Sequence, residues 1–178
     1  MDRECNIHVQ QIVNLNTLKI ITSLLNSKYC DTSPRPTDLF WTPGQDCIAR
    51  FQVSGEWCRG RVLNVDVESQ SCDVRFVDFG TEDYCSITDL RKDLFAKEFP
   101  IQCFTITIED VEPLDGKCWD KSALDFLQER VVESEEEVLV TVRRGGTFPL
   151  CAASVTTKDG TNIGALMVSK DMARRVEG

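Results

Sequence analysis

The chain has 178 residues, of which 42% are hydrophobic and 28% are charged. This length and balance are typical of one compact domain or of two small lobes that share a core, and they exclude a disordered chain and a large multidomain protein. Asp and Glu outnumber Lys and Arg by 29 to 20, which gives a formal net charge of −9. Such a surface disfavours direct binding of nucleic acid and favours cationic ligands such as Arg-rich or Lys-rich peptides.

The nine cysteines include no CxxC pair, and the chain has a single histidine, His8. Structural zinc sites and Cys–His catalytic dyads need such residues close together, so the sequence predicts no metal, no cofactor and no nucleophilic catalysis. The odd cysteine count and the absence of a long apolar run favour free thiols in a reducing intracellular compartment, without membrane contact.

The predicted elements begin with a short strand around Ile7 and Val9, followed by a helix whose apolar residues recur from Leu15 to Leu25. A polar, proline-rich connector follows at 31–43. Short strands separated by turn signals are then expected at 46–51, 57–65, 71–79 and 83–87. Strands this short and this closely spaced predict a small bent antiparallel barrel.

Beyond the barrel the sequence predicts a helical turn at 87–92, a strand at 101–108, an amphipathic helix at 119–131, strands at 138–143 and 149–156 around Gly145-Gly146, and a last helical turn through Leu166. The N-terminal strand and helix are too small to bury themselves, so we expect them to pack against these C-terminal elements. The predicted fold class is mainly β with flanking helices (α+β).

The run from Gly44 to Gly80, GQDCIARFQVSGEWCRGRVLNVDVESQSCDVRFVDFG, resembles the Tudor domain, whose two hairpins read roughly C-x-A…G-x-W-Y-R-A-x-V and V-x-F-V/I-D-Y-G-N. The flanking segments resemble the staphylococcal-nuclease-like (SN-like, OB-like) halves of an extended Tudor domain. The resemblance implies one extended Tudor module over residues 1–178. It consists of a Tudor-type bent antiparallel barrel at 41–90, inserted in an SN-like/OB-like lobe formed by 1–40 with 91–178.

Extended Tudor domains occur in germline proteins of the Piwi-interacting RNA pathway, where they bind arginine-rich tails that often carry symmetric dimethylarginine. The resemblance therefore implies a non-catalytic module that binds the arginine-rich N-terminal tail of a Piwi/Argonaute-family protein. It also implies a cytoplasmic location, in a perinuclear germ granule (nuage).

The resemblance further implies an aromatic cage, because a methylated guanidinium keeps its charge, loses N–H donors and binds stacked aromatic faces through cation–π contacts. Carried over from the family pattern, the four cage walls fall on Phe51, Cys58, Phe76 and Phe79, and the polar cage position falls on Thr81. Two positions depart from the pattern, which has Tyr in place of Cys58 and Asn in place of Thr81. This incomplete cage leaves open whether methylated or unmethylated arginine is preferred.

Other residues near the cage have predicted roles of their own. Glu82 and Asp83 follow the cage turn and are expected to form an acidic lip, which suits an unmethylated guanidinium with its five N–H donors. Trp57 is predicted to be a core anchor between barrel strands. Asp78 is predicted to form a structural ion pair with Arg91 across the boundary between barrel and lobe.

Two other classes of function are compatible with the sequence. A germ-granule scaffold or oligomerisation domain would self-associate through exposed apolar surface on the N-terminal helix or the 31–43 connector, without binding arginine peptides. A metal-dependent nuclease would need Asp, Glu and Arg clustered around a metal, as in true staphylococcal-type nucleases. The sequence contains no matching cluster, so no catalytic residue is predicted.

Overall fold

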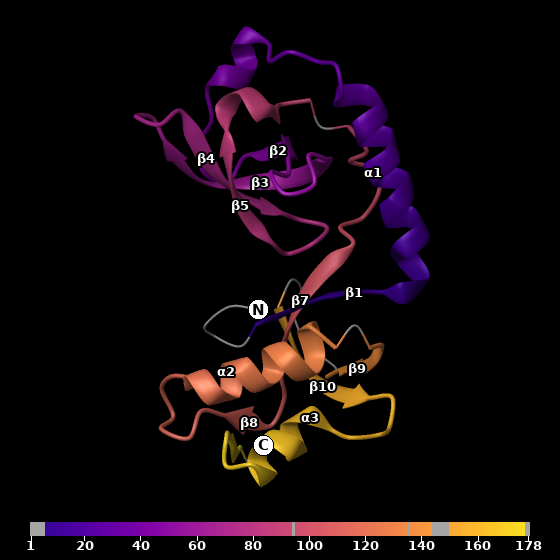
Figure 1. Ribbon diagram of the computed structural model, residues 1–178, viewed down its shortest axis with the longest axis vertical. Helices are drawn as coiled ribbons and strands as arrows, with labels where there is room; N and C mark the ends of the chain where they lie inside the picture. The colour runs from indigo at the N-terminus through magenta and orange to yellow at the C-terminus, as the bar shows by residue number, and fades with distance from the viewer. Residues whose placement is uncertain (1–5, 94, 135, 144–149, 177–178) are drawn as a thin grey trace. The chain divides into compact units, whose positions relative to one another are not determined.

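The computed structural model describes residues 6–93, 95–134, 136–143 and 150–176 (Figure 1). The chain divides into two compact units, one formed by Val9–Phe104 and the other by the N-terminal residues through His8 together with the chain from Thr105. The expected Gly145-Gly146 turn lies outside the described residues.

The first unit contains a five-stranded sheet in the order β5-β4-β3-β2-β6, in which all neighbouring strands are antiparallel. Its strands are β2 (Asp46–Arg50), β3 (Trp57–Asp66), β4 (Ser71–Phe76), β5 (Glu82–Ser86) and β6 (Leu90–Arg91). A single 3-10 turn, Ile87–Asp89, joins β5 to β6. The sheet curls (Figure 1), as the bent barrel predicted from the sequence requires. Buried side chains of its strands form an apolar core.

The middle of β2 and the first four residues of β3 are buried on both faces of the sheet. Alternate side chains of a strand point to opposite sides, so these residues contribute to two apolar clusters. Ala49 and Cys58 belong to the barrel core, whereas their neighbours Ile48 and Trp57 belong to a second apolar cluster on the outer face. The core is packed so closely that a Cβ added to Gly60 would lie 2.5 Å from a methyl group of Val74.

Helix α1 (Leu15–Tyr29) covers this outer face of the barrel. Its residues Leu25 and Tyr29 cluster with Ile48 and Trp57, and the ring centroids of Tyr29 and Trp57 lie 5.7 Å apart. This arrangement differs from our expectation that the N-terminal helix packs against C-terminal elements. The physical reason is the second apolar stripe on β2 and β3, which needs a cover of its own.

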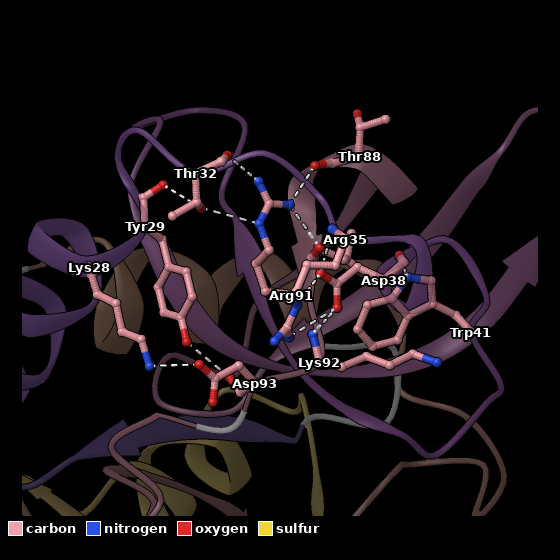
Figure 2. Close-up of polar contacts among 11 residues, drawn as sticks. Lys28, Tyr29, Thr32, Arg35, Asp38, Trp41, Thr88, Arg91, Lys92 and Asp93 are labelled. Atoms are coloured by element: carbon pink, nitrogen blue, oxygen red, sulfur yellow. Dashed lines mark hydrogen bonds and ion pairs between the residues drawn. The ribbon is translucent and has the colours of Figure 1, made fainter.

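The proline-rich connector is organised around one buried carboxylate (Figure 2). Asp38 lies in the 3-10 helix Pro36–Leu39, and its side chain accepts hydrogen bonds from the backbone N–H groups of Arg35 (2.9 Å) and Lys92 (3.0 Å). Its carbonyl accepts a bond of 2.7 Å from the indole N–H of Trp41. Burial by itself raises the pKa of Asp38, but these hydrogen bonds and the Arg35 charge outweigh burial and hold the pKa below its ordinary value.

The second unit is built on a four-stranded sheet in the order β1-β7-β10-β9. Its strands are β1 (Ile7–Gln10), β7 (Cys103–Ile108), β9 (Val138–Val142) and β10 (Leu150–Thr157). Strand β10 runs parallel to β7 and antiparallel to β9. The chain divides within β1 and β7, so these two strands contribute residues to both units.

Two short helices and a small two-stranded sheet complete the second unit. Helices α2 (Lys121–Leu127) and α3 (Ile163–Ser169) follow Asp120 and Asn162, whose side chains each accept an N-capping hydrogen bond of 2.8 Å. A π-helical stretch, Gln128–Val132, continues α2, so only part of the helix expected at 119–131 is α-helical. Strands β8 (Val111–Glu112) and β11 (Arg174–Arg175) pair antiparallel.

Candidate functional site

The predicted cage residues lie on two loops of the barrel and on the adjoining strand ends. Phe51 is on the loop between β2 and β3, Phe79 and Thr81 are on the loop between β4 and β5, and Cys58 and Phe76 lie in β3 and β4. The second loop is closed by a backbone hydrogen bond of 2.8 Å from Phe76 N to Thr81 O. The carboxylate of Asp83 accepts a bond of 3.2 Å from Gln52 N on the first loop. The ring of Phe51 contacts that of Phe76, so the fold brings the two loops together.

The predicted cage walls form one cluster, in which the rings of Phe51 and Phe76 meet edge to face with 5.1 Å between centroids and 69° between planes. Phe76 is only 1% exposed and Cys58 only 4%, so both lie inside the barrel core. Phe51 and Phe79 are partly buried and pack against that core. The structure thus assembles the four positions but leaves ring surface accessible at Phe51 and Phe79 only.

Cys58 occupies its wall position as a neutral thiol. Burial raises its pKa to about 12, and the nearby carboxylates of Glu56 and Asp78 add to the shift. At neutral pH the side chain therefore acts as a small apolar group. It offers no π face, so an arginine ligand would lack one ring that the family pattern places there.

The predicted lip residues already have partners within the chain. Glu82 pairs with Arg75, its neighbour across β4 and β5, with 2.9 Å between Arg75 Nε and the carboxylate. Asp83 accepts hydrogen bonds from Gln52 N and from Tyr84 N (2.8 Å). Thr81 is exposed in the turn. Asp83, opposite the core residue Val74, orders the two loops, whereas Glu82 forms an exposed ion pair on the other face of the sheet.

Asp78 forms its ion pair with Arg59 and not with the predicted partner Arg91, which corrects the sequence-based assignment. The pair is bidentate, with 2.8 Å between Arg59 Nε and Asp78 Oδ2 and 2.6 Å between Nη2 and Oδ1. The backbone N–H of Gln102 donates a third bond, of 2.9 Å, to Asp78. The physical reason is alternation along β3, which puts Arg59 on the outer face where the turn after β4 returns.

Sequence reasoning missed Arg59 as a structural residue. Its guanidinium also donates to the carbonyls of Ala96 (3.0 Å), Phe99 (2.6 Å) and Pro100 (2.8 Å), so it fastens the segment that follows the barrel. The available signal was an arginine that directly follows Trp57 and Cys58 in a predicted strand. A buried charge needs a fixed counter-ion, and Asp78 of the same motif provides it.

Arg91 has a different structural role (Figure 2). Its Nη1 and Nη2 donate to the carbonyls of Thr88 (2.7 Å) and Thr32 (2.5 Å), and its guanidinium lies over the Trp57 ring, 4.7 Å from the centroid. Burial is the main cause that lowers the pKa of Arg91. Trp57, buried in the outer cluster, contacts both this guanidinium and the Tyr29 ring. Because Arg91 also donates to Thr32 of the connector, it holds the connector against the barrel.

Within the described residues, no three or more His, Cys, Asp or Glu side chains are placed to hold a metal ion. No helix in the described ranges is long and apolar enough to cross a membrane.

The family model of the Tudor domain matches residues 1–110, which is more than half of the chain. The chain belongs to the Tudor domain family. It is 24% identical over 174 residues to Tudor domain-containing protein 1 of Danio rerio, covering 94% of this chain and 14% of that protein. It is 30% identical over 120 residues to Tudor and KH domain-containing protein of Mus musculus, covering 65% and 20%. The chain thus spans a fifth or less of the length of these relatives.

Solved structures share the fold over nearly the whole chain. The extended Tudor domain of human TDRD1, crystallised with a symmetrically dimethylated peptide, matches with a TM-score of 0.88 at 20% identity, covering 99% of this chain and 86% of that one. The extended Tudor domain of Drosophila melanogaster Tudor-SN matches with 0.85 at 16% identity, covering 100% and 82%. A variant of the Drosophila melanogaster Papi extended Tudor domain, solved with an unmethylated Piwi N-terminal peptide, matches with 0.78 at 20% identity, covering 99% and 95%. These matches confirm the predicted fold class, a mainly β extended Tudor fold with flanking helices.

Proposed function

We propose that this chain is a non-catalytic peptide-binding module that recognises arginine-rich N-terminal tails of Piwi-type proteins, methylated or unmethylated, through an incomplete aromatic cage. The observation that carries the proposal is the cluster of Phe51, Phe76 and Phe79, formed by the end of β4 and by two loops that Asp83 joins. The solved relatives bound to dimethylated and unmethylated peptides support this ligand class. The family of the chain supports a location in cytoplasmic germ granules of the Piwi-interacting RNA pathway.

The charge of the chain supports a cationic ligand. A net charge of −9 raises the local concentration of a basic peptide and speeds its encounter with the site. On the exposed face of β4 and β5, the pair between Arg75 and Glu82 is half-exposed, and exposed pairs contribute only about 0–1 kcal/mol. A guanidinium from a peptide can therefore replace Arg75 beside Glu82 at little cost.

The departures from the family pattern at Cys58 and Thr81 affect how strongly the site should prefer methylated arginine. Each well-placed ring contributes about 0.5–2 kcal/mol to a desolvated cation, so a cage without the ring at Cys58 gains less from methyl groups. Thr81 offers one hydroxyl in place of an amide with both donor and acceptor. We expect a smaller preference for dimethylated over unmethylated peptide than a four-ring cage would show.

Calorimetric titration tests the proposal. The ligands are matched Arg/Ala- and Arg/Gly-repeat peptides, each unmodified and symmetrically dimethylated. Phe79→Ala should abolish or strongly weaken binding, while Val67→Ala, which truncates an exposed apolar residue on the β3–β4 turn, should leave it unchanged. Failure of the folded wild-type chain to bind any of the four peptides would sink the proposal.

The second candidate function is a germ-granule scaffold that self-associates without binding arginine peptides. Exposed apolar side chains on α1 and the connector favour it, among them Ile20, Leu24 and Phe40, the last 76% exposed. Light scattering of wild type and of Ile20→Lys separates the candidates when it is combined with the peptide titration. Self-association that Ile20→Lys abolishes, together with absent peptide binding, would support the scaffold.

A further inference from the structure

Strand β9 is an apolar edge strand of the sheet in the second unit. In the strand order β1-β7-β10-β9 it pairs with β10 on one side, and no described strand pairs with its other side. Its sequence, VLVTV, has high β-propensity and no charge, and Leu139 is 67% exposed. Soluble proteins protect such edges with charges, proline or a cover, so an open edge of this composition points to a pairing partner.

The pairing with β10 fixes which backbone groups of β9 face the open edge. Arg143 N donates to Ala152 O at 3.1 Å, so Arg143 belongs to the residues whose backbone groups point toward β10. Because these groups alternate along an antiparallel strand, the N–H and C=O groups of Val138, Val140 and Val142 point away from β10. Three residues in regular alternation therefore present donors and acceptors along the edge.

We infer that β9 pairs antiparallel with β9 of a second copy of this chain, about a two-fold axis at Val140. In this register Val140 meets Val140 of the partner subunit, and Val138 meets the partner's Val142. Every outward donor then meets an outward acceptor, and each of these pairs exchanges two hydrogen bonds. Such an interface is isologous, so it closes as a dimer.

The charges at the ends of β9 support a second copy of this chain as the pairing partner. The same register puts Glu137, immediately before the strand, opposite the partner's Arg143, and the two-fold axis repeats this pair at the other end. Both side chains are exposed and lie on the same face as Leu139. Arg143 also contacts Asp110 (3.1 Å) and Glu109 (3.9 Å). Exposed pairs of this kind contribute only about 0–1 kcal/mol, so the partner's Glu137 can compete for the guanidinium. A parallel pairing would instead place Glu137 beside Glu137.

The short strand implies a modest interface. Five residues per subunit bury less surface than a standard stable interface, so we expect a concentration-dependent equilibrium between monomer and dimer. Sedimentation velocity of the full chain over a range of concentrations should show a species of twice the monomer mass. A chain that stays monomeric at every concentration would overturn the inference.

Two variants of the edge test its location. Val140→Pro removes an N–H that points away from β10, so it should abolish the dimer while the pairing with β10 is kept. Leu139→Lys adds a charge on the exposed face beside the partner and should shift the equilibrium to monomer. The matched control is Val67→Lys, at an exposed position on the barrel, which should leave the dimer unchanged. A dimer that survives both edge variants would place the contact elsewhere and refute the pairing.

A charge swap tests the register. Glu137→Arg and Arg143→Glu each turn two opposite-charge pairs into like-charge pairs, and each should raise the dimer dissociation constant by at least about tenfold. An equimolar mixture of the two variants should restore dimers, because every pair across the interface is then again of opposite charge. Circular dichroism confirms that each variant is folded. A mixture that remains as monomeric as its components would contradict the register.

Discussion

Arg59 and Asp78 form a bidentate ion pair between β3 and the turn that follows β4, with side chains only 10% and 2% exposed. Because both side chains are buried, the pair stabilises the candidate site from inside the protein. It fixes the turn that carries Phe79, while the same guanidinium holds the backbone of the segment after the barrel. The arrangement of the loop that carries Phe79 therefore depends on a buried charge pair.

Removal of the Arg59 charge should destabilise the protein strongly. Arg59→Met leaves the Asp78 carboxylate buried without a cation, and loss of one member of a buried pair costs about 3–5 kcal/mol. Urea unfolding followed by circular dichroism measures the change in the free energy of unfolding. The control is Arg61→Met, which breaks the exposed pair between Arg61 and Asp46 and should cost only about 0–1 kcal/mol. Equal losses for the two variants would show that the buried pair is not special.

Phe76 and Phe79 should separate stability from binding. Phe76→Ala removes a fully buried ring and should lower the free energy of unfolding by about 3–5 kcal/mol. Phe79→Ala truncates a half-exposed ring, so it should cost clearly less stability but most of the affinity for an arginine peptide. Urea unfolding and calorimetric titration of both variants check this. Unchanged affinity in folded Phe79→Ala would remove Phe79 from the site.

Cys58→Tyr should increase the preference for dimethylated over unmodified peptide. The new ring adds a cation–π surface of about 0.5–2 kcal/mol, which corresponds to a change in the affinity ratio of about twofold to about thirtyfold. Overpacking of the core opposes this with a stability cost of about 1–3 kcal/mol, so unfolding is measured in parallel. Cys58→Ser is the control without a ring. An unchanged ratio of the two affinities in Cys58→Tyr would mean that the methyl groups are not recognised at this position.

Acid should weaken the connector. The pKa of Asp38 is lowered in the folded protein relative to its ordinary value of 3.8, so its carboxylate stabilises the fold above that pH, and this stabilisation is lost as the pH falls through the folded pKa. Unfolding by urea at a series of pH values should show stability that declines on the acid side. Asp38→Asn should be less stable at neutral pH and show a shallower decline. Other aspartates shift in the same direction, so the difference between Asp38→Asn and wild type isolates this group. Parallel curves for the two proteins would argue against this role.

The sequence was sufficient to predict the strands of the barrel. It was insufficient to predict which element covers their outer face. The alternation in β2 to β4 and the turn signals predicted their positions to within a few residues, because each strand is specified locally. The packing of α1 on Ile48 and Trp57 was not foreseen. An apolar stripe shows that a face is covered, but which element covers it depends on contacts distant in sequence.

The candidate site shows the same division between local and long-range information. The motif grouped Phe51, Cys58, Phe76 and Phe79, and the structure brings them into one cluster. The burial of Phe76 and the partner of Asp78 could not be deduced, because both depend on the path of the chain through the core and after the barrel. From the sequence alone, Arg59 and Arg91 are equally plausible partners of Asp78. The structure distinguishes them, because Arg59 lies on the outer face of β3, where the turn that carries Asp78 returns.

The cover that α1 provides determines how the barrel could be transplanted into another protein. A segment cut at 41–90 would lose the helix over Ile48 and Trp57 and would expose an apolar patch to solvent. It would also deprive Arg59 of the carbonyls beyond the last barrel strand. The smallest segment suitable for transfer is therefore Val9–Phe104, about twice the length of the 41–90 segment. Domain swaps between proteins should exchange that whole stretch.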